Sequence, residues 1–157
     1  MTELLLPVAL FTNGIAAGVL VGTMLGVVPF YRTLGAPEYV RAHAFSSTRY
    51  DPFQPICLVT TLVIDTILAA TVDAFAARAL CAAAAVTTLG VVIISVSRNV
   101  PMNRWIVRQD PDAMPADWDF ESFRANWARW NGIRATVAIL AFVFNISAAV
   151  ALLALGL

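Results

Sequence analysis

Four long apolar blocks divide the sequence, and each is close to the roughly 20 residues that a helix needs to cross the hydrocarbon core of a bilayer. The blocks run over about 4–31, 53–72, 76–97 and 133–157. Only 13% of the residues are charged, whereas soluble domains carry about a quarter. The sequence therefore predicts an all-α fold, in which a single integral membrane domain over 1–157 forms a four-helix bundle in the cell membrane.

The first block differs from a secretory signal in two respects. Glu3 stands where such signals carry basic residues, and the apolar stretch is longer than a signal's core. We therefore expect this block to remain in the mature protein as the first span.

The arginines predict the orientation of the bundle. All ten basic residues are arginine, and most of them lie in or beside the polar segments 32–52 and 98–132, namely Arg32, Arg41, Arg49, Arg98, Arg104, Arg108, Arg124, Arg129 and Arg134. The positive-inside tendency places both segments in the cytoplasm and both termini outside. Because the formal net charge is zero, no general attraction to nucleic acid is expected.

Glycines recur at every fourth residue of the first block, at Gly14, Gly18, Gly22 and Gly26. This spacing lines one helix face with glycine and lets another backbone approach closely. The predicted packing seam has two candidate partners, which the sequence leaves open. One is the alanine-rich segment 81–90 of the third block, and the other is a second copy of the chain or another member of a membrane complex.

Polar side chains inside the apolar blocks are costly and are therefore candidate functional groups. Asp65 lies near the middle of the second block. It is either a structural carboxyl bonded to Asn13, Thr87 or Thr88, or a group that handles protons or a ligand. Asn13 and Asn145 are more typical of hydrogen bonds between helices.

The stretch "DFESFRANWARWNGIR" predicts an amphipathic helix on the cytoplasmic side, before the last span, with Asp117 or Asp119 as its N-cap. At 100° per residue, one face of this helix carries four aromatic residues, an asparagine and an arginine, namely Phe120, Phe123, Trp127, Trp130, Asn131 and Arg134. One interpretation is a belt that anchors the helix at the membrane interface. The other is a pocket for a flat, acidic ligand, in which the guanidinium holds an anionic oxygen.

Two further segments lie on the same predicted side. "SRNVPMNRWI" ends the third span at Pro101 and then offers Asn103. "APEYVRAHAFSSTRY" predicts a short interfacial helix that carries the sequence's one histidine, His43. Histidine titrates near neutral pH, so His43 is a candidate general base, although a lone histidine is more typical of an ordinary loop position.

Metal-ligating residues are sparse and dispersed. Cys57 and Cys81 lie in separate apolar blocks and are expected to be packing residues. With one histidine and no ligand spacing, we predict no metal site within a single chain.

The combination of "VPMN" after the third span with the tryptophan-rich segment resembles the anthrone-oxygenase-like membrane family, long described as a domain of unknown function. The resemblance covers essentially the whole chain, and its distinctive residues are Pro101, Asn103, Trp118, Trp127, Trp130, Asn131 and Arg134. Members in polyketide pathways oxidise anthrones to anthraquinones with molecular oxygen and no recognised metal or flavin. The resemblance implies a cofactor-independent monooxygenase whose partners are a small aromatic substrate, oxygen and the lipid bilayer.

On this hypothesis, aromatic side chains stack against the planar substrate. The candidates are Trp127 and Trp130, together with Trp118 or Phe123.

The same hypothesis needs an anion site and a base. Arg134, with Asn131 and Asn103, would hold the oxyanion that forms when the acidic methylene loses a proton. His43 or Asp65 would accept that proton. These two are proposed from their chemistry, because neither belongs to the matching motif.

Two other kinds of function compete with an oxygenase. A non-catalytic small subunit of a larger membrane complex would explain the glycine face and the interfacial tryptophans, and a small-molecule carrier is a further alternative. The oxygenase predicts a cavity bounded by Trp127, Trp130, Arg134 and Asn103, whereas the subunit predicts a neighbouring chain on that face. No phosphate-binding loop, dinucleotide fingerprint or nucleophile elbow is present.

Overall fold

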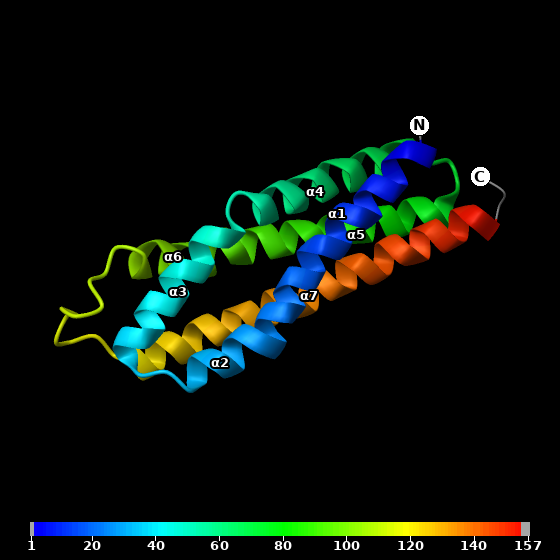
Figure 1. Ribbon diagram of the computed structural model, residues 1–157. Helices are drawn as coiled ribbons and strands as arrows, with labels where there is room; N and C mark the ends of the chain where they lie inside the picture. The colour runs from blue at the N-terminus through cyan, green and yellow to red at the C-terminus, as the bar shows by residue number, and fades with distance from the viewer. Residues whose placement is uncertain (1, 155–157) are drawn as a thin grey trace.

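The computed structural model describes residues 2–154 and folds them entirely into helices and connecting segments, without a strand in that range. Four helical spans are long and apolar enough to cross a membrane, namely Thr2–Arg32, Phe53–Thr71, Phe75–Ile106 and Phe120–Ala154. They form an elongated bundle in which Thr2 and Ala154 lie at one end (Figure 1). The predicted all-α membrane bundle is confirmed; residues 155–157 of the predicted last span lie outside the described residues, and the side on which the termini lie stays a prediction.

The first and third spans each contain one wider, π-helical turn. The first span consists of α1 (Thr2–Gly22), η1 (Thr23–Val27) and α2 (Val28–Arg32), and the third of α5 (Phe75–Ile94), η2 (Ser95–Asn99) and α6 (Val100–Ile106). Each π-helical turn is followed within two residues by a proline, Pro29 or Pro101. Proline lacks an N–H and clashes with the preceding turn, which widens the helix there. Both widened turns lie toward the arginine-rich end.

The interfacial helix predicted around His43 is present as α3 (Ala36–Tyr50). It lies at the end of the bundle opposite Thr2 and Ala154, next to α6 (Figure 1). The second span, α4 (Phe53–Thr71), begins directly after Pro52 and has Pro55 in its first turn, where proline is tolerated.

The amphipathic segment and the last span are one continuous helix of 35 residues, α7 (Phe120–Ala154). The Asp119 carboxylate accepts a 3.0 Å hydrogen bond from the Ser122 amide and caps this helix, as predicted. The same backbone bonds hold the pKa of Asp119 below its usual value. No proline occurs between Phe120 and Ala154, and the single Gly132 costs too little to interrupt so long a helix. The third span also runs beyond residue 97, so the segment between these helices is only 107–119.

Helix α1 packs mainly against α4 and α7, so the alanine-rich part of α5, one of the candidate partners that the sequence left open, is not a main neighbour of α1. Only Gly14 of the glycine series is packed closely, since a Cβ added there would lie 3.2 Å from the Phe142 ring. Gly18, Gly22 and Gly26 are exposed and have no such neighbour within 4 Å. The bundle interior therefore does not use most of the glycine face.

A polar layer separates two apolar clusters in the middle of the bundle. Asn145 of α7 donates a 3.1 Å hydrogen bond to the Asp65 carboxylate of α4, so this asparagine links two helices as predicted. Both residues are fully buried, as is Asn13 of α1. Cys81 packs in one apolar cluster and Cys57 in the other, and both thiols are free.

Candidate functional site

A cavity of about 540 Å³ lies at the arginine-rich end of the bundle. Its walls come from η1, the end of α3, the first turns of α4, the α5–η2–α6 span and α7. The volume falls within the roughly 300–1,000 Å³ that is usual for small-molecule sites. Both π-helical turns contribute to its lining, through Thr23 and Ser95 among others, and such turns are frequent at functional sites.

Arg134 lines this cavity and is only 8% exposed. Its Nε and Nη2 both donate to the Asn131 side-chain oxygen, at 3.0 and 2.7 Å, and its Nη1 donates to Ser95 Oγ at 3.3 Å. Both partners are neutral, and no carboxylate among residues 2–154 forms an ion pair with this guanidinium. The Asp51 carboxylate shares the cavity lining and attracts Arg134 without touching it. Because a buried cation without a direct ion pair is costly, the geometry favours binding of an anion in the cavity.

Asn103 is another polar residue of the lining, and its orientation is fixed by two donors. The Trp127 indole N–H donates to the Asn103 oxygen at 2.8 Å, and His43 Nε2 lies 3.1 Å from the same oxygen. The indole can only donate, so the contacted atom is the oxygen and His43 Nε2 carries a proton. The Asn103 amide N–H₂ group makes no hydrogen bond within the described part of the chain and is available to a ligand.

His43 is buried and neutral, and it does not line the cavity. Its Nδ1 accepts a 2.9 Å hydrogen bond from the Tyr39 hydroxyl, because Nε2 is the protonated nitrogen. Burial lowers the pKa of His43 to about 4 and outweighs the contribution of the Asn103 bond. Both ring nitrogens are thus engaged, and the geometry makes His43 a support for Asn103.

Two further polar residues of the lining come from the segment that joins α3 to α4. Gln54 is buried, and its amide nitrogen has no hydrogen-bond partner among the described residues. Among residues 2–154, Asp51 is the one acidic residue that lines the cavity. Sequence reasoning missed both, although a glutamine between Pro52 and Pro55 at the start of an apolar span was a usable signal.

The family model for anthrone oxygenases matches residues 42–144. The chain belongs to the anthrone oxygenase family. The matched range includes every cavity-lining residue named above except Thr23. Family membership supports an oxygenase-like function at the level of the family. No match to the chain was found among curated proteins or among solved structures.

In this member of the anthrone oxygenase family, Trp127 is the predicted aromatic residue that lines the cavity. Trp118 and Phe123 lie outside it, in an aromatic cluster with Trp105, at ring-centroid distances of 5.1–5.6 Å from one another. Trp130 also lies outside, with the Arg98 guanidinium over its ring at 4.7 Å. These three side chains pack helices together rather than bounding the cavity.

The two remaining predicted site residues lie behind the cavity or far from it. Asn131 is fully buried and contacts Arg134 without lining the cavity. Asp65 is absent from the lining and bonds Asn145 in the polar layer, so the predicted partners Asn13, Thr87 and Thr88 were wrong. The described residues contain no group of three histidine, cysteine or acidic side chains that could hold a metal ion.

Proposed function

We propose that this protein oxygenates a flat, acidic aromatic substrate of the anthrone type in the cavity, without a cofactor. The observation that carries the proposal is the buried Arg134 guanidinium, which lines the cavity and has no carboxylate partner in the described range. An anthrone supplies the missing negative charge when it ionises. The family assignment supports an oxygenase-type reaction.

The proposed reaction balances with oxygen as the oxidant. A base removes one proton from the ring methylene, and the charge moves to the carbonyl oxygen as an enolate. The enolate passes one electron to O₂, and the resulting carbon radical and superoxide combine to a peroxide at the former methylene carbon. Return of the proton gives a hydroperoxide, which loses water to form the quinone. One oxygen atom enters the product and the other leaves as water.

The donors in the cavity would stabilise the enolate oxygen. Arg134 contributes a charge, while the free N–H₂ groups of Asn103 and Gln54 contribute neutral donors. Donors fixed before the reaction act most strongly in a buried site that excludes water. The Trp127 ring offers an aromatic surface beside them.

Asp51 is the proton acceptor in this proposal. Its carboxylate lines the same cavity as Arg134, so a substrate can contact both groups. His43 already donates from Nε2 and accepts at Nδ1, and Asp65 lies outside the lining. The geometry therefore favours Asp51 over the two bases that the sequence suggested.

Oxygen uptake by the detergent-purified protein with dithranol, a simple anthrone, tests the proposal. We expect uptake well above the spontaneous rate in samples whose metal and flavin contents are far below one per chain. Arg134→Gln should reduce the rate by about 10²–10³-fold, the usual effect of losing one such donor. Arg108→Gln, which removes an exposed arginine outside the cavity, serves as the matched control and should retain the wild-type rate.

Two results would overturn this proposal. Uptake no faster than the protein-free sample would exclude anthrone oxidation and favour the subunit or carrier alternative. Uptake that follows the metal or flavin content would exclude cofactor independence.

A further inference from the structure

A second concave region lies on the opposite side of Trp127, between the end of the first span and the first half of α7. This groove has a volume of about 730 Å³ and is lined by Met24, Val28, Tyr31 and Arg32 from the first span and by residues between Glu121 and Thr136 of α7. It is separate from the proposed oxygenase cavity, since the two linings share only Trp127.

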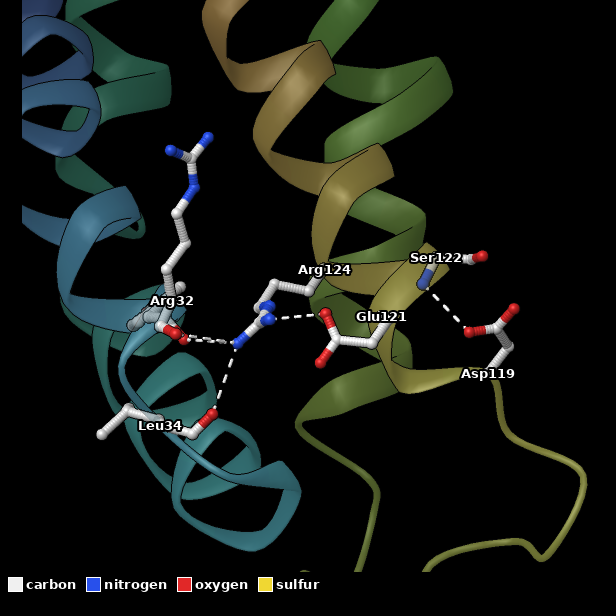
Figure 2. Close-up of polar contacts among 7 residues, drawn as sticks. Arg32, Leu34, Asp119, Glu121, Ser122 and Arg124 are labelled. Atoms are coloured by element: carbon white, nitrogen blue, oxygen red, sulfur yellow. Dashed lines mark hydrogen bonds and ion pairs between the residues drawn. The ribbon is translucent and has the colours of Figure 1, made fainter.

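One arginine of the groove is fully engaged. The Arg124 Nη1 donates to the backbone carbonyls of Tyr31, Arg32 and Leu34, and its Nη2 pairs with the Glu121 carboxylate. Figure 2 shows these contacts joining the end of α2 to the first turn of α7. Arg124 therefore ties the two walls together, and Glu121 is neutralised by it.

Two other arginines of the groove have no such partner. Arg32 and Arg129 are exposed, and neither side chain forms an ion pair or hydrogen bond within residues 2–154. In Figure 2 the Arg32 side chain extends away from Arg124, along the space between the first span and α7. The lining therefore carries two uncompensated positive charges.

The groove changes from charged to apolar along α7. Glu121, Arg124 and Arg129 occupy its outer part, and Gly132, Ile133 and Thr136 its inner part. At 1.5 Å per residue this stretch covers about 22 Å along the helix axis. Met24 and Val28 provide the facing wall. A ligand that matches this gradient has an anionic head and an apolar tail.

We propose that this groove binds an anionic phospholipid. The phosphate lies between Arg32 and Arg129, and an acyl chain runs inward against Met24, Val28 and Ile133. Charge complementarity decides the occupant, because two unpaired arginines at the boundary of a membrane span attract the anionic lipids of that leaflet. A zwitterionic lipid would leave their charge uncompensated.

Lipid retention measured by native mass spectrometry tests this site. The whole protein in detergent is given phosphatidylglycerol or phosphatidylcholine with the same acyl chains. Wild type should retain phosphatidylglycerol preferentially. The Arg32→Gln/Arg129→Gln protein should lose that preference by an order of magnitude or more, since each arginine near an anionic surface contributes about fivefold.

Arg49→Gln/Arg108→Gln provides the matched control, because it removes two arginines from the same end of the bundle that lie outside the groove. It should retain the lipid as wild type does. Gly132→Leu tests the apolar part independently. A Cβ there would lie 3.4 Å from the flexible end of Met24, so the larger side chain should fit the fold and obstruct the acyl chain.

Three results would overturn the lipid site. Equal loss in the control pair would show a general charge effect, and equal retention of phosphatidylcholine would show no selectivity for an anion. Displacement of the lipid by millimolar inorganic phosphate would show a site for free phosphate. Because oxygen uptake is not the readout, failure here is distinct from failure of the oxygenase proposal.

Discussion

Arg134 is oriented by Asn131 through two hydrogen bonds to one oxygen, from Nε at 3.0 Å and from Nη2 at 2.7 Å. The asparagine lies three residues earlier in α7, so both side chains lie on the same side of the helix. A neutral amide fixes the direction of the guanidinium but does not cancel its charge. The pair therefore holds a positive charge at the cavity wall that forms no direct ion pair within residues 2–154.

Replacing Arg134 should separate activity from stability. In Arg134→Met an apolar side chain of similar length removes the desolvation cost of a buried cation without a direct ion pair, which offsets the loss of its hydrogen bonds to Asn131 and Ser95. We expect oxygen uptake to fall by about 10²–10³-fold while the melting temperature in detergent stays equal or rises. A large drop in melting temperature would instead show that the charge stabilises the fold.

Asn131→Asp should weaken anion binding while the Arg134 side chain stays in place. The new carboxylate would lie at hydrogen-bond distance from Arg134 and neutralise it, so an ionised substrate would gain less from binding. We expect the KM for dithranol to rise and kcat to fall, with no loss of stability. Asn126→Asp introduces the same charge at an exposed position of the same helix and should leave both constants unchanged. Equal effects from both variants would contradict a specific role for Asn131.

The spans and the central site residues could be predicted from local patterns. Apolar length predicted the four helices, and the spacing of Trp127, Asn131 and Arg134 predicted that they share one buried face. Helical spacing shows which side chains share a face, but it does not show which other helix each of those side chains packs against. Trp130 belongs to the same predicted face, yet it packs against Arg98 outside the cavity.

Contacts between distant segments were not predictable from one sequence. His43 and Asn103 are 60 residues apart and meet because α3 lies beside α6. That packing turns the expected base into a support for an amide. Gln54 likewise becomes a candidate donor only because the start of α4 faces α7 across the cavity.

Asp51→Asn tests the proposed proton acceptor. The amide has nearly the same shape as the carboxylate but cannot take a proton under these conditions. We expect kcat to fall by about 10²–10⁴-fold, the usual contribution of general base catalysis, with little change in KM. Asp73→Asn removes an exposed carboxylate at the opposite end of the bundle and should retain full activity. Retained activity in Asp51→Asn would assign the proton transfer to another group.

His43 should make stability depend on pH in acid. Burial lowers its pKa from 6.5 to about 4, so the unfolded chain binds more protons than the folded protein between these values. The contribution is complete above about pH 6.5 and is lost as the pH falls towards 4, by roughly 3 kcal/mol at most. His43→Gln keeps an N–H donor for Asn103. Its melting temperature should fall less than that of wild type between pH 7 and pH 4.5, and equal slopes would contradict the assignment.

The pairing of Asp65 with Asn145 predicts a structural role for the mid-membrane carboxyl. Asn145→Leu removes the one side-chain donor that residues 2–154 supply to the fully buried Asp65 carboxyl and should cost about 1–3 kcal/mol of stability. Replacing both residues by leucine should recover part of that loss, since neither substitution then leaves a polar atom of the other residue unpaired. A double-mutant cycle on melting temperature measures this coupling.

Asp65→Asn tests whether the Asp65 carboxyl takes part in the reaction. It preserves an acceptor for Asn145 but removes the ionisable group, and Asp65 lies outside the cavity lining. We therefore expect oxygen uptake within about twofold of wild type. A loss comparable to that expected for Asp51→Asn would place Asp65 on the path of the proton, because the hydrogen bond that it makes in the bundle survives this substitution.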